Sequence, residues 1–140
     1  MTLPRSVAAL ITARRLERVP ADHPSALARL ARAEEKLHAA RKIASIDVEV
    51  AYVTAYDATR IAVTAYMLAT GYRVRAGAGA HDAVGIFAES QISSPSAREF
   101  QRMRRRRNKS EYDDIDIGRA DLTADLAHAE AIIAAVGAVL

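Results

Sequence analysis

The chain has 140 residues, of which 51% are hydrophobic, so it can build one core but is too short for two ordinary domains. It has no Cys, which excludes disulfides, zinc fingers and thiol catalysis, and no Trp, while Ala, Leu, Arg and Glu abound. The net charge is +3. This composition favours helices over sheets, and we expect an all-α fold, an up-and-down bundle of four to five helices in a single domain over residues 1–140.

A first helix is predicted from Pro4, a favourable first-turn residue, to about Arg18, where P-A-D-H-P interrupts the pattern. Its apolar run is broken at Arg14 and Arg15, too early for a signal or transmembrane segment. We therefore expect a cytoplasmic protein with no membrane contact, in which residues 1–24 are a candidate N-terminal appendage.

The next helix is predicted to begin with Ser25 as its N-cap and to continue through an amphipathic stripe. The stripe consists of Leu27, Leu30, Ala33, Leu37, Ala40 and Ile43. The longest predicted helix follows, from Asp47 to Thr70, and Gly71 is its expected stop. One seam of this helix is Tyr52, Tyr56, Thr59, Val63 and Tyr66. Core packing is expected for the tyrosines, with their hydroxyls reaching a polar groove.

Asp57 and Arg60 lie beside that tyrosine seam. They could form an ordinary i,i+3 pair, or they could support a site between helices. The stretch G-Y-R-V-R-A-G-A-G-A-H then reads as a flexible linker, because it lacks the preceding strand and the following Lys-Ser/Thr of a phosphate-binding loop.

A short helix is predicted from His81 to Gln91, with His81 as its cap. The four histidines are far apart in the sequence and none are spaced as i,i+4 pairs, so we expect neither a metal site nor a cofactor.

The segment S-S-P-S precedes a predicted helix near Ala97 to Lys109, with Phe100 and Met103 as apolar anchors. Five of the six residues from 102 to 107 are Arg. Seven basic residues and one acid between positions 98 and 109 give this stretch a charge of +6, which leaves −3 for the rest of the chain. Such a concentration predicts contact with a polyanion or an acidic partner at one place.

Consecutive arginines point around a helix and cannot all meet one ligand. Arg102 and Arg106 share one face, and Arg107 shares another with Met103. Because Met103 should be buried, Arg107 is expected to point inward, while the others are solvated or contact phosphates without sequence specificity. A last helix is predicted after Gly118, with one apolar stripe made of Leu122, Leu126, Ala129, Ile133, Val136 and Leu140.

The order of several motifs resembles the HEPN superfamily (higher eukaryotes and prokaryotes nucleotide-binding domain) over residues 25–140. The motifs are A-Y-D-A-T-R-I-A-V-T-A-Y-M-L-A-T-G-Y-R-V-R, a glycine-bearing loop, A-H-D-A-V-G-I-F, R-x-x-R-R-R-R-N-K-S-E-Y and an Ala-rich helix. The resemblance implies a helical bundle that commonly dimerises and is often encoded beside a minimal nucleotidyltransferase in bacterial toxin-antitoxin or phage-defence modules.

Active HEPN ribonucleases carry an Arg followed, after four to six residues, by a His. Here Arg107 is followed after four residues by Tyr112. A tyrosine with a pKa of about 10 is a poor general base at neutral pH, so the resemblance implies a site in which RNA cleavage is weak or absent. It further implies that Arg102, Arg106, Arg107, Asn108 and Lys109 bind RNA or nucleotide, that Arg107 and Tyr112 are the catalytic candidates, and that Asp57, Arg60 and Glu111 support them.

Three functions remain open on the sequence. The first is an RNA- or nucleotide-binding component of a toxin-antitoxin or defence pair, working as a homodimer that brings both arginine helices together. The second is an active metal-independent endoribonuclease toxin. The third is a non-catalytic helical adaptor or the antitoxin partner of a nucleotidyltransferase.

Overall fold

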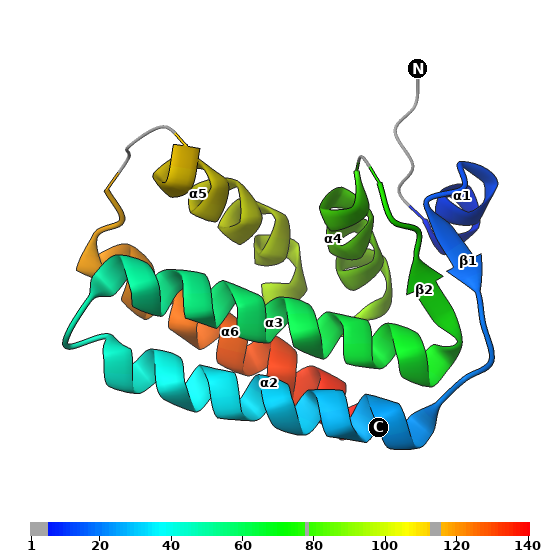
Figure 1. The fold of residues 1–140 in the computed structure, drawn as a ribbon, viewed down its shortest axis with the longest axis horizontal. Helices are drawn as coiled ribbons and strands as arrows, with labels where there is room; N and C mark the ends of the chain where they lie inside the picture. The colour runs from blue at the N-terminus through cyan, green and yellow to red at the C-terminus, as the bar shows by residue number, and fades with distance from the viewer. Residues whose placement is uncertain (1–5, 78, 113–115) are drawn as a thin grey trace.

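The computed structural model describes residues 6–77, 79–112 and 116–140. Three long helices form the bundle: α2 (His23–Ile43), α3 (Val48–Thr70) and α6 (Arg119–Val139). Helices α4 (Ala80–Gln91) and α5 (Phe100–Tyr112) lie on the side of α3 away from α2, and the 3₁₀ helix η1 (Pro95–Glu99) precedes α5 (Figure 1). The expected all-α bundle is confirmed.

The ends of α2 and α3 follow from local capping. Asp47 caps α3 by accepting a hydrogen bond from the Val50 N–H at 3.0 Å, and Gly71 ends it in the left-handed conformation, as predicted. The predicted N-cap of α2 is wrong by one turn. Asp22 is the cap, and its carboxylate accepts from the backbone N–H of Ser25 at 3.1 Å and from its hydroxyl at 2.8 Å.

Residues 7–18 do not form the single helix that was predicted to begin at Pro4, which itself lies outside the described residues. Helix α1 (Val7–Thr12) is followed by strand β1 (Leu16–Arg18), which pairs antiparallel with β2 (Tyr72–Val74). The predicted flexible linker therefore contains a strand. Pairing is favoured because Leu16 is buried on one side of β1, while Glu17 and Arg73 form an ion pair across the ladder at 2.5 Å.

Strand β1 thus joins the N-terminal segment to the rest of the fold. Leu10 and Leu16 belong to the same core cluster as side chains of α2, α3 and α6.

Most of the predicted tyrosine seam lies in the core. Tyr52, Tyr56, Thr59 and Val63 are buried, and Tyr66 is partly buried. The ring of Tyr56 stacks on that of Phe100, with 5.5 Å between their centroids. Because Phe100 and Met103 are both fully buried, they fix one face of α5 against α3.

The short helices differ by a few residues from their predicted limits. Helix α5 runs to Tyr112 and is preceded by η1, whose N-cap is Ser94. The residue at the N-cap of α4 is Gly79, in the left-handed conformation, so the prediction of His81 as the cap is wrong. His81 is exposed.

Helix α6 is long and apolar enough to cross a membrane by length and composition alone. The core helix of a globular bundle meets the same criteria. Its predicted stripe packs inward, with Leu122, Ala129, Ile133 and Val136 buried, as in a bundle helix.

Candidate functional site

Helix α5 carries the arginine cluster, and two groups of its cations differ in their contacts. Arg102, Arg104 and Arg106 make ion pairs with carboxylates of neighbouring elements. Arg105 and Lys109 are exposed, and no ion pair joins either of them to another described residue. The cations available to an external anion are therefore fewer than the charge of +6 implies.

Asp125 of α6 is the acceptor for the first group. Its side chain is 1% exposed. Arg102 donates to Oδ1 from Nη2 at 2.5 Å and to Oδ2 from Nη1 at 3.1 Å. Arg106 Nη1 donates to Oδ2 at 2.9 Å, and the Tyr52 hydroxyl donates to the same oxygen at 2.7 Å. One buried carboxylate thus joins α3, α5 and α6.

The ionisation of this cluster follows from burial and hydrogen bonding. Burial alone would raise the pKa of Asp125, but hydrogen bonds from Arg102 and Tyr52, with the charges of Arg102 and Arg106, outweigh it and lower that pKa. Burial raises the pKa of the Tyr52 hydroxyl, and its bond to the carboxylate raises it further. Asp125 is therefore charged and Tyr52 is neutral at physiological pH.

Asp82 of α4 forms a second carboxylate centre. Arg104 Nη2 lies 3.5 Å from Oδ1, and Arg15 Nη1, from the N-terminal segment, lies 3.3 Å from Oδ2. The Gln101 amide donates to Oδ1 at 3.0 Å and accepts from Arg104 Nε at 2.9 Å. Gly85 leaves room for this amide, since a Cβ at Gly85 would lie 2.3 Å from Gln101 Cδ.

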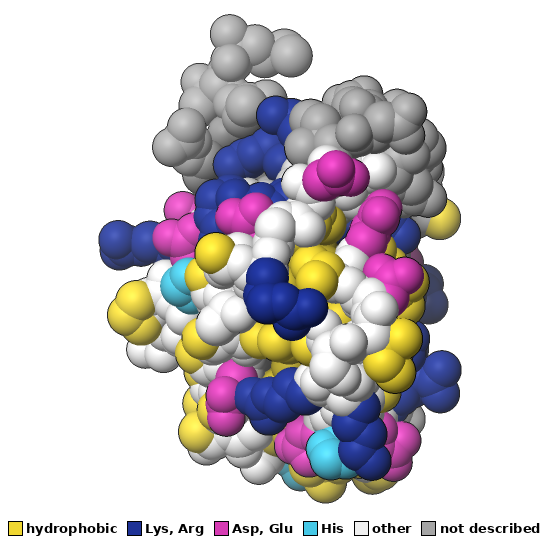
Figure 2. All heavy atoms as spheres, turned by 90° about the vertical axis from the view of Figure 1, so that its left-hand side faces the viewer, with side chains coloured by type: hydrophobic (Ala, Val, Ile, Leu, Met, Phe, Trp, Pro, Cys, Tyr) yellow, Lys and Arg dark blue, Asp and Glu magenta, His cyan; other side chains and the backbone are white. Residues whose placement is uncertain are grey.

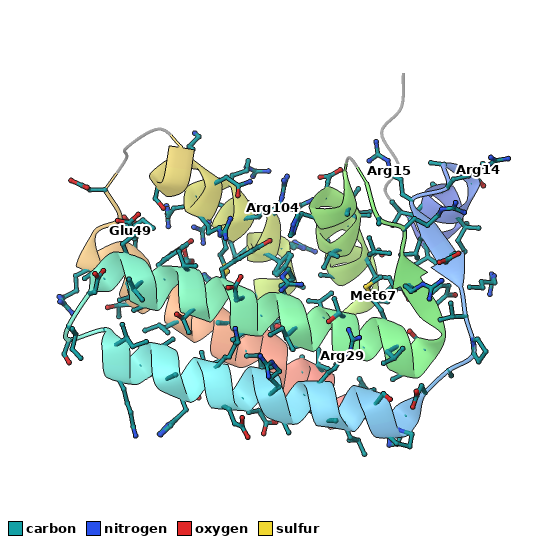
Figure 3. The ribbon with its side chains drawn as sticks, viewed as in Figure 1. Arg14, Arg15, Arg29, Glu49, Met67 and Arg104 are labelled. Atoms are coloured by element: carbon teal, nitrogen blue, oxygen red, sulfur yellow. The ribbon has the colours of Figure 1, made fainter. Side chains whose placement is uncertain are left out.

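Arg107 lines a groove of about 280 Å³ between the first turns of α3 and the end of α5. We call it the Arg107 groove; its lining residues are Glu49, Val50, Val53, Thr54, Arg107 and Ser110. Its walls combine apolar side chains with one acidic and one basic group. Glu49 projects from the start of α3, on the side of the molecule where α5 ends (Figure 3).

Two of the predicted supporting residues, Asp57 and Arg60, lie near Tyr56. Burial raises the pKa of the Tyr56 hydroxyl, Asp57 adds to the increase, and the charges of Arg104, Arg60 and Arg107 oppose it. No ion pair joins Asp57 to Arg60 among the described residues, so the ordinary i,i+3 pair is absent. An orienting role of Asp57 toward Arg107 stays a prediction.

Other predicted positions are only partly defined. Asn108 is half-buried, and Ser110 is buried with its hydroxyl bonded to the Arg107 carbonyl at 3.0 Å. The backbone of α5 includes Glu111 and Tyr112, but their side chains lie outside the described part of the chain. Within that part, no three His, Asp or Glu side chains come together as metal ligands would.

For the arginine helix, two expectations are confirmed and one is corrected. Met103 is buried, and Arg102 and Arg106 share a face, as predicted. These two are not solvated outer arginines, however, because Asp125 draws both toward the bundle.

The predicted stripe of the last helix leaves out Asp125. The signal was available, since Asp125 lies three residues after Leu122 and four before Ala129, and so shares their face.

The fold and this site define a class: a helical bundle whose arginine-rich helix is fixed by a buried carboxylate and exposes Arg105 and Lys109 to solvent. The family model of the HEPN domain matches residues 26–139. The chain belongs to the HEPN domain family. HEPN domains have roles related to nucleotides or RNA and often dimerise. No curated protein and no solved structure matches the chain significantly.

Proposed function

We propose that this chain is the RNA- or nucleotide-binding component of a prokaryotic toxin-antitoxin or phage-defence system. It acts in the cytoplasm as a homodimer with a basic groove, beside a nucleotidyltransferase partner, and its ribonuclease activity is weak or absent. The observation that carries the proposal is the presence, on a HEPN fold, of exposed Arg105 and Lys109 next to the Arg107 groove.

The two groups of cations in α5 have different roles in this proposal. Arg102 and Arg106 hold the helix in place through Asp125, and they add to the local positive potential without offering free guanidinium groups. Arg105 and Lys109 lie one turn apart on the exposed face, a spacing suited to a phosphate backbone. Arg107 and Asn108 contribute from the edge of the groove.

The expected chemistry at Arg107 is binding without efficient proton transfer. A guanidinium can hold a phosphate through paired hydrogen bonds. Attack by a 2′-hydroxyl would also need a group that accepts its proton, and Tyr112 stands at the position of the family's His. Cleavage is therefore slow relative to binding.

The first prediction concerns RNA affinity. Binding to single-stranded RNA should weaken steeply with salt, because each phosphate contact contributes about 0.7 to the slope of log affinity against log salt. Replacing both Arg105 and Lys109 with Ala should lower the slope by about 1.4, the value for two contacts. Fluorescence anisotropy over a salt series measures this slope.

The matched control for that measurement is Arg29→Gln with Arg32→Gln on α2. Both arginines are exposed, and the double variant removes the same net charge from another element. If the control lowers the salt slope by the same amount, RNA affinity depends only on the net charge of the protein and not on these two positions. An absence of wild-type binding even at low salt would contradict the proposed function.

The second prediction concerns assembly. Ile46 is 83% exposed and Val50 is 48% exposed, and Val50 also lines the Arg107 groove, so a partner that covers them would lie beside α5. At this end of the molecule, hydrophobic side chains reach the surface below a group of basic ones (Figure 2).

Light scattering at micromolar concentration should give the mass of a dimer, and Ile46→Asp with Val50→Asp should give a folded monomer. Exposed Val139, at the end of α6, provides the control position, where Asp should leave the dimer intact. A monomer mass for the wild type would contradict the dimer.

A further inference from the structure

The segment from α1 to β1 lies outside the region that matches the HEPN model, yet it is fixed to the bundle. The match begins at residue 26. Leu10 is fully buried and Leu16 is 1% exposed, and the pairing of β1 with β2 sets the position of the chain between them. The residues that join α1 to β1 are therefore held in a defined place.

Arg15, in that connection, reaches the arginine helix through a shared partner. Arg15 and Arg104 contact opposite oxygens of Asp82, at 3.3 and 3.5 Å. Their side chains are 34% and 21% exposed, so water or a ligand still reaches both of them. One carboxylate between two guanidiniums leaves a net positive charge at this point.

Two more arginines extend the charge beyond Arg15. The Arg75 N–H donates to the Arg15 carbonyl at 3.0 Å, which places Arg75 beside it, and Arg75 and Arg14 are both exposed. No ion pair joins either of these two to another described residue. Of the four arginines, Arg15 and Arg104 contact Asp82, and the four together with this carboxylate carry a net charge of +3.

Arg14 has an unusual backbone for a residue with a side chain. Its φ is +58°, in the left-handed region. The Arg14 N–H donates to the Ile11 carbonyl at 3.0 Å and the Arg15 N–H to the Leu10 carbonyl at 2.9 Å, the two bonds of a Schellman helix end. Glycine is the residue best suited to this position. An arginine here keeps a cation at a conformational cost.

We propose that Arg14, Arg15 and Arg75, together with Arg104, form a second part of the RNA-binding surface, continuous with the exposed face of α5. This proposal rests on the proposed function. The bound RNA strand would run from Arg105 and Lys109 across Arg104 to the N-terminal segment. Arg104, Arg15 and Arg14 follow one another along one edge of the molecule, while Arg29 lies away from that edge (Figure 3).

The chemistry of this surface fits an RNA backbone better than a lipid surface. Proteins that lie on membranes combine cations with apolar side chains that enter the lipid. The large exposed hydrophobic residues of the described chain are Leu27, Ile46, Val50 and Val139, and they lie on α2, in the turn after it, at the start of α3 and on α6. In the described part of the chain, the surface around Arg14, Arg15 and Arg75 carries an excess of cations and no large exposed hydrophobic side chain, which suits a phosphate backbone.

The test compares RNA binding by the full chain carrying Arg14→Gly and Arg75→Gln with binding by the Arg29→Gln, Arg32→Gln control. Both double variants remove two exposed charges. The Arg14→Gly change relieves the left-handed backbone, so the melting temperature of that single variant should stay the same or rise. For a strand of about 15 nucleotides, the Arg14, Arg75 variant should lose about 1.4 in salt slope and on the order of tenfold in affinity at 0.1 M salt.

Shortening the RNA provides an independent readout. A strand of about two nucleotides carries too few phosphates to contact the arginines of both segments at once, so the two double variants should differ less in salt slope with it than with the longer strand. If the wild type binds RNA and the Arg105, Lys109 variant loses slope, but the Arg14, Arg75 variant behaves as the control does, then this inference alone is overturned. If the wild type binds anionic vesicles and no RNA, both the inference and the proposed function are overturned.

Discussion

Replacing Asp125 with Ala is expected to lower the free energy of unfolding by about 3 kcal/mol. The change leaves two guanidiniums and the Tyr52 hydroxyl without their shared acceptor. Breaking a buried ion pair on one side costs about 3–5 kcal/mol. The lower end applies here, because the side chains of Arg102 and Arg106 are 34% and 31% exposed, so water can partly replace the carboxylate.

Urea unfolding of both proteins, monitored by circular dichroism, measures this difference. Glu99→Ala is the matched control, since Glu99 binds Arg102 at 2.7 Å but its side chain is 38% exposed. An exposed pair of this kind contributes about 0–1 kcal/mol. Equal losses of unfolding free energy in the two variants would show that the burial of Asp125 does not strengthen its interaction with α5.

Changing Tyr112 to His is expected to increase RNA cleavage by about a hundredfold, the usual contribution of one positioned acid or base. The resemblance to active HEPN ribonucleases places a His at this position after Arg107. An imidazole exchanges its proton near neutral pH, whereas a phenol does not. Single-turnover cleavage of a labelled RNA, with the variant in excess, measures the gain without interference from product release.

Two further variants define the origin of any activity. Tyr112→Phe should give no gain, because it removes the hydroxyl without adding a proton acceptor. Arg107→Ala in the Tyr112→His background should weaken binding and remove the gain. Robust cleavage by the wild type that survives Arg107→Ala would place the chemistry outside the R-N-K-S-E-Y segment and would defeat the proposal.

The long helices could be predicted because their information is local. In α3 the period of the tyrosine seam, the Asp47 cap and the Gly71 stop all lie within the helix or next to it. The strands could not be predicted in this way. Each has three residues, and their pairing joins Glu17 to Arg73, 56 positions later, through a contact that only the tertiary fold creates.

The site shows the same division between local and distant information. The shared face of Arg102 and Arg106 follows from helix geometry, but its direction depends on Asp125, 23 residues after Arg102. A charged residue within an apolar stripe indicates a buried partner without identifying it. Whether these arginines face bulk water or the bundle depends on how α6 packs, which the local sequence does not define.

The Asp125 cluster also fixes an order in which the structure can be completed during synthesis. The arginine helix leaves the ribosome before α6, and domains form from the N-terminal side as the chain emerges. The stacking of Phe100 on Tyr56 needs only residues that have already been made. Arg102 and Arg106 can pair with Asp125 only after α6 has been made, because Asp125 lies 73 residues after Tyr52. Until α6 arrives, Arg106 lacks its partners Asp121 and Asp125, and Arg102 has Glu99 but not Asp125, so both are more open to any polyanion nearby, including the ribosomal RNA that the chain is leaving.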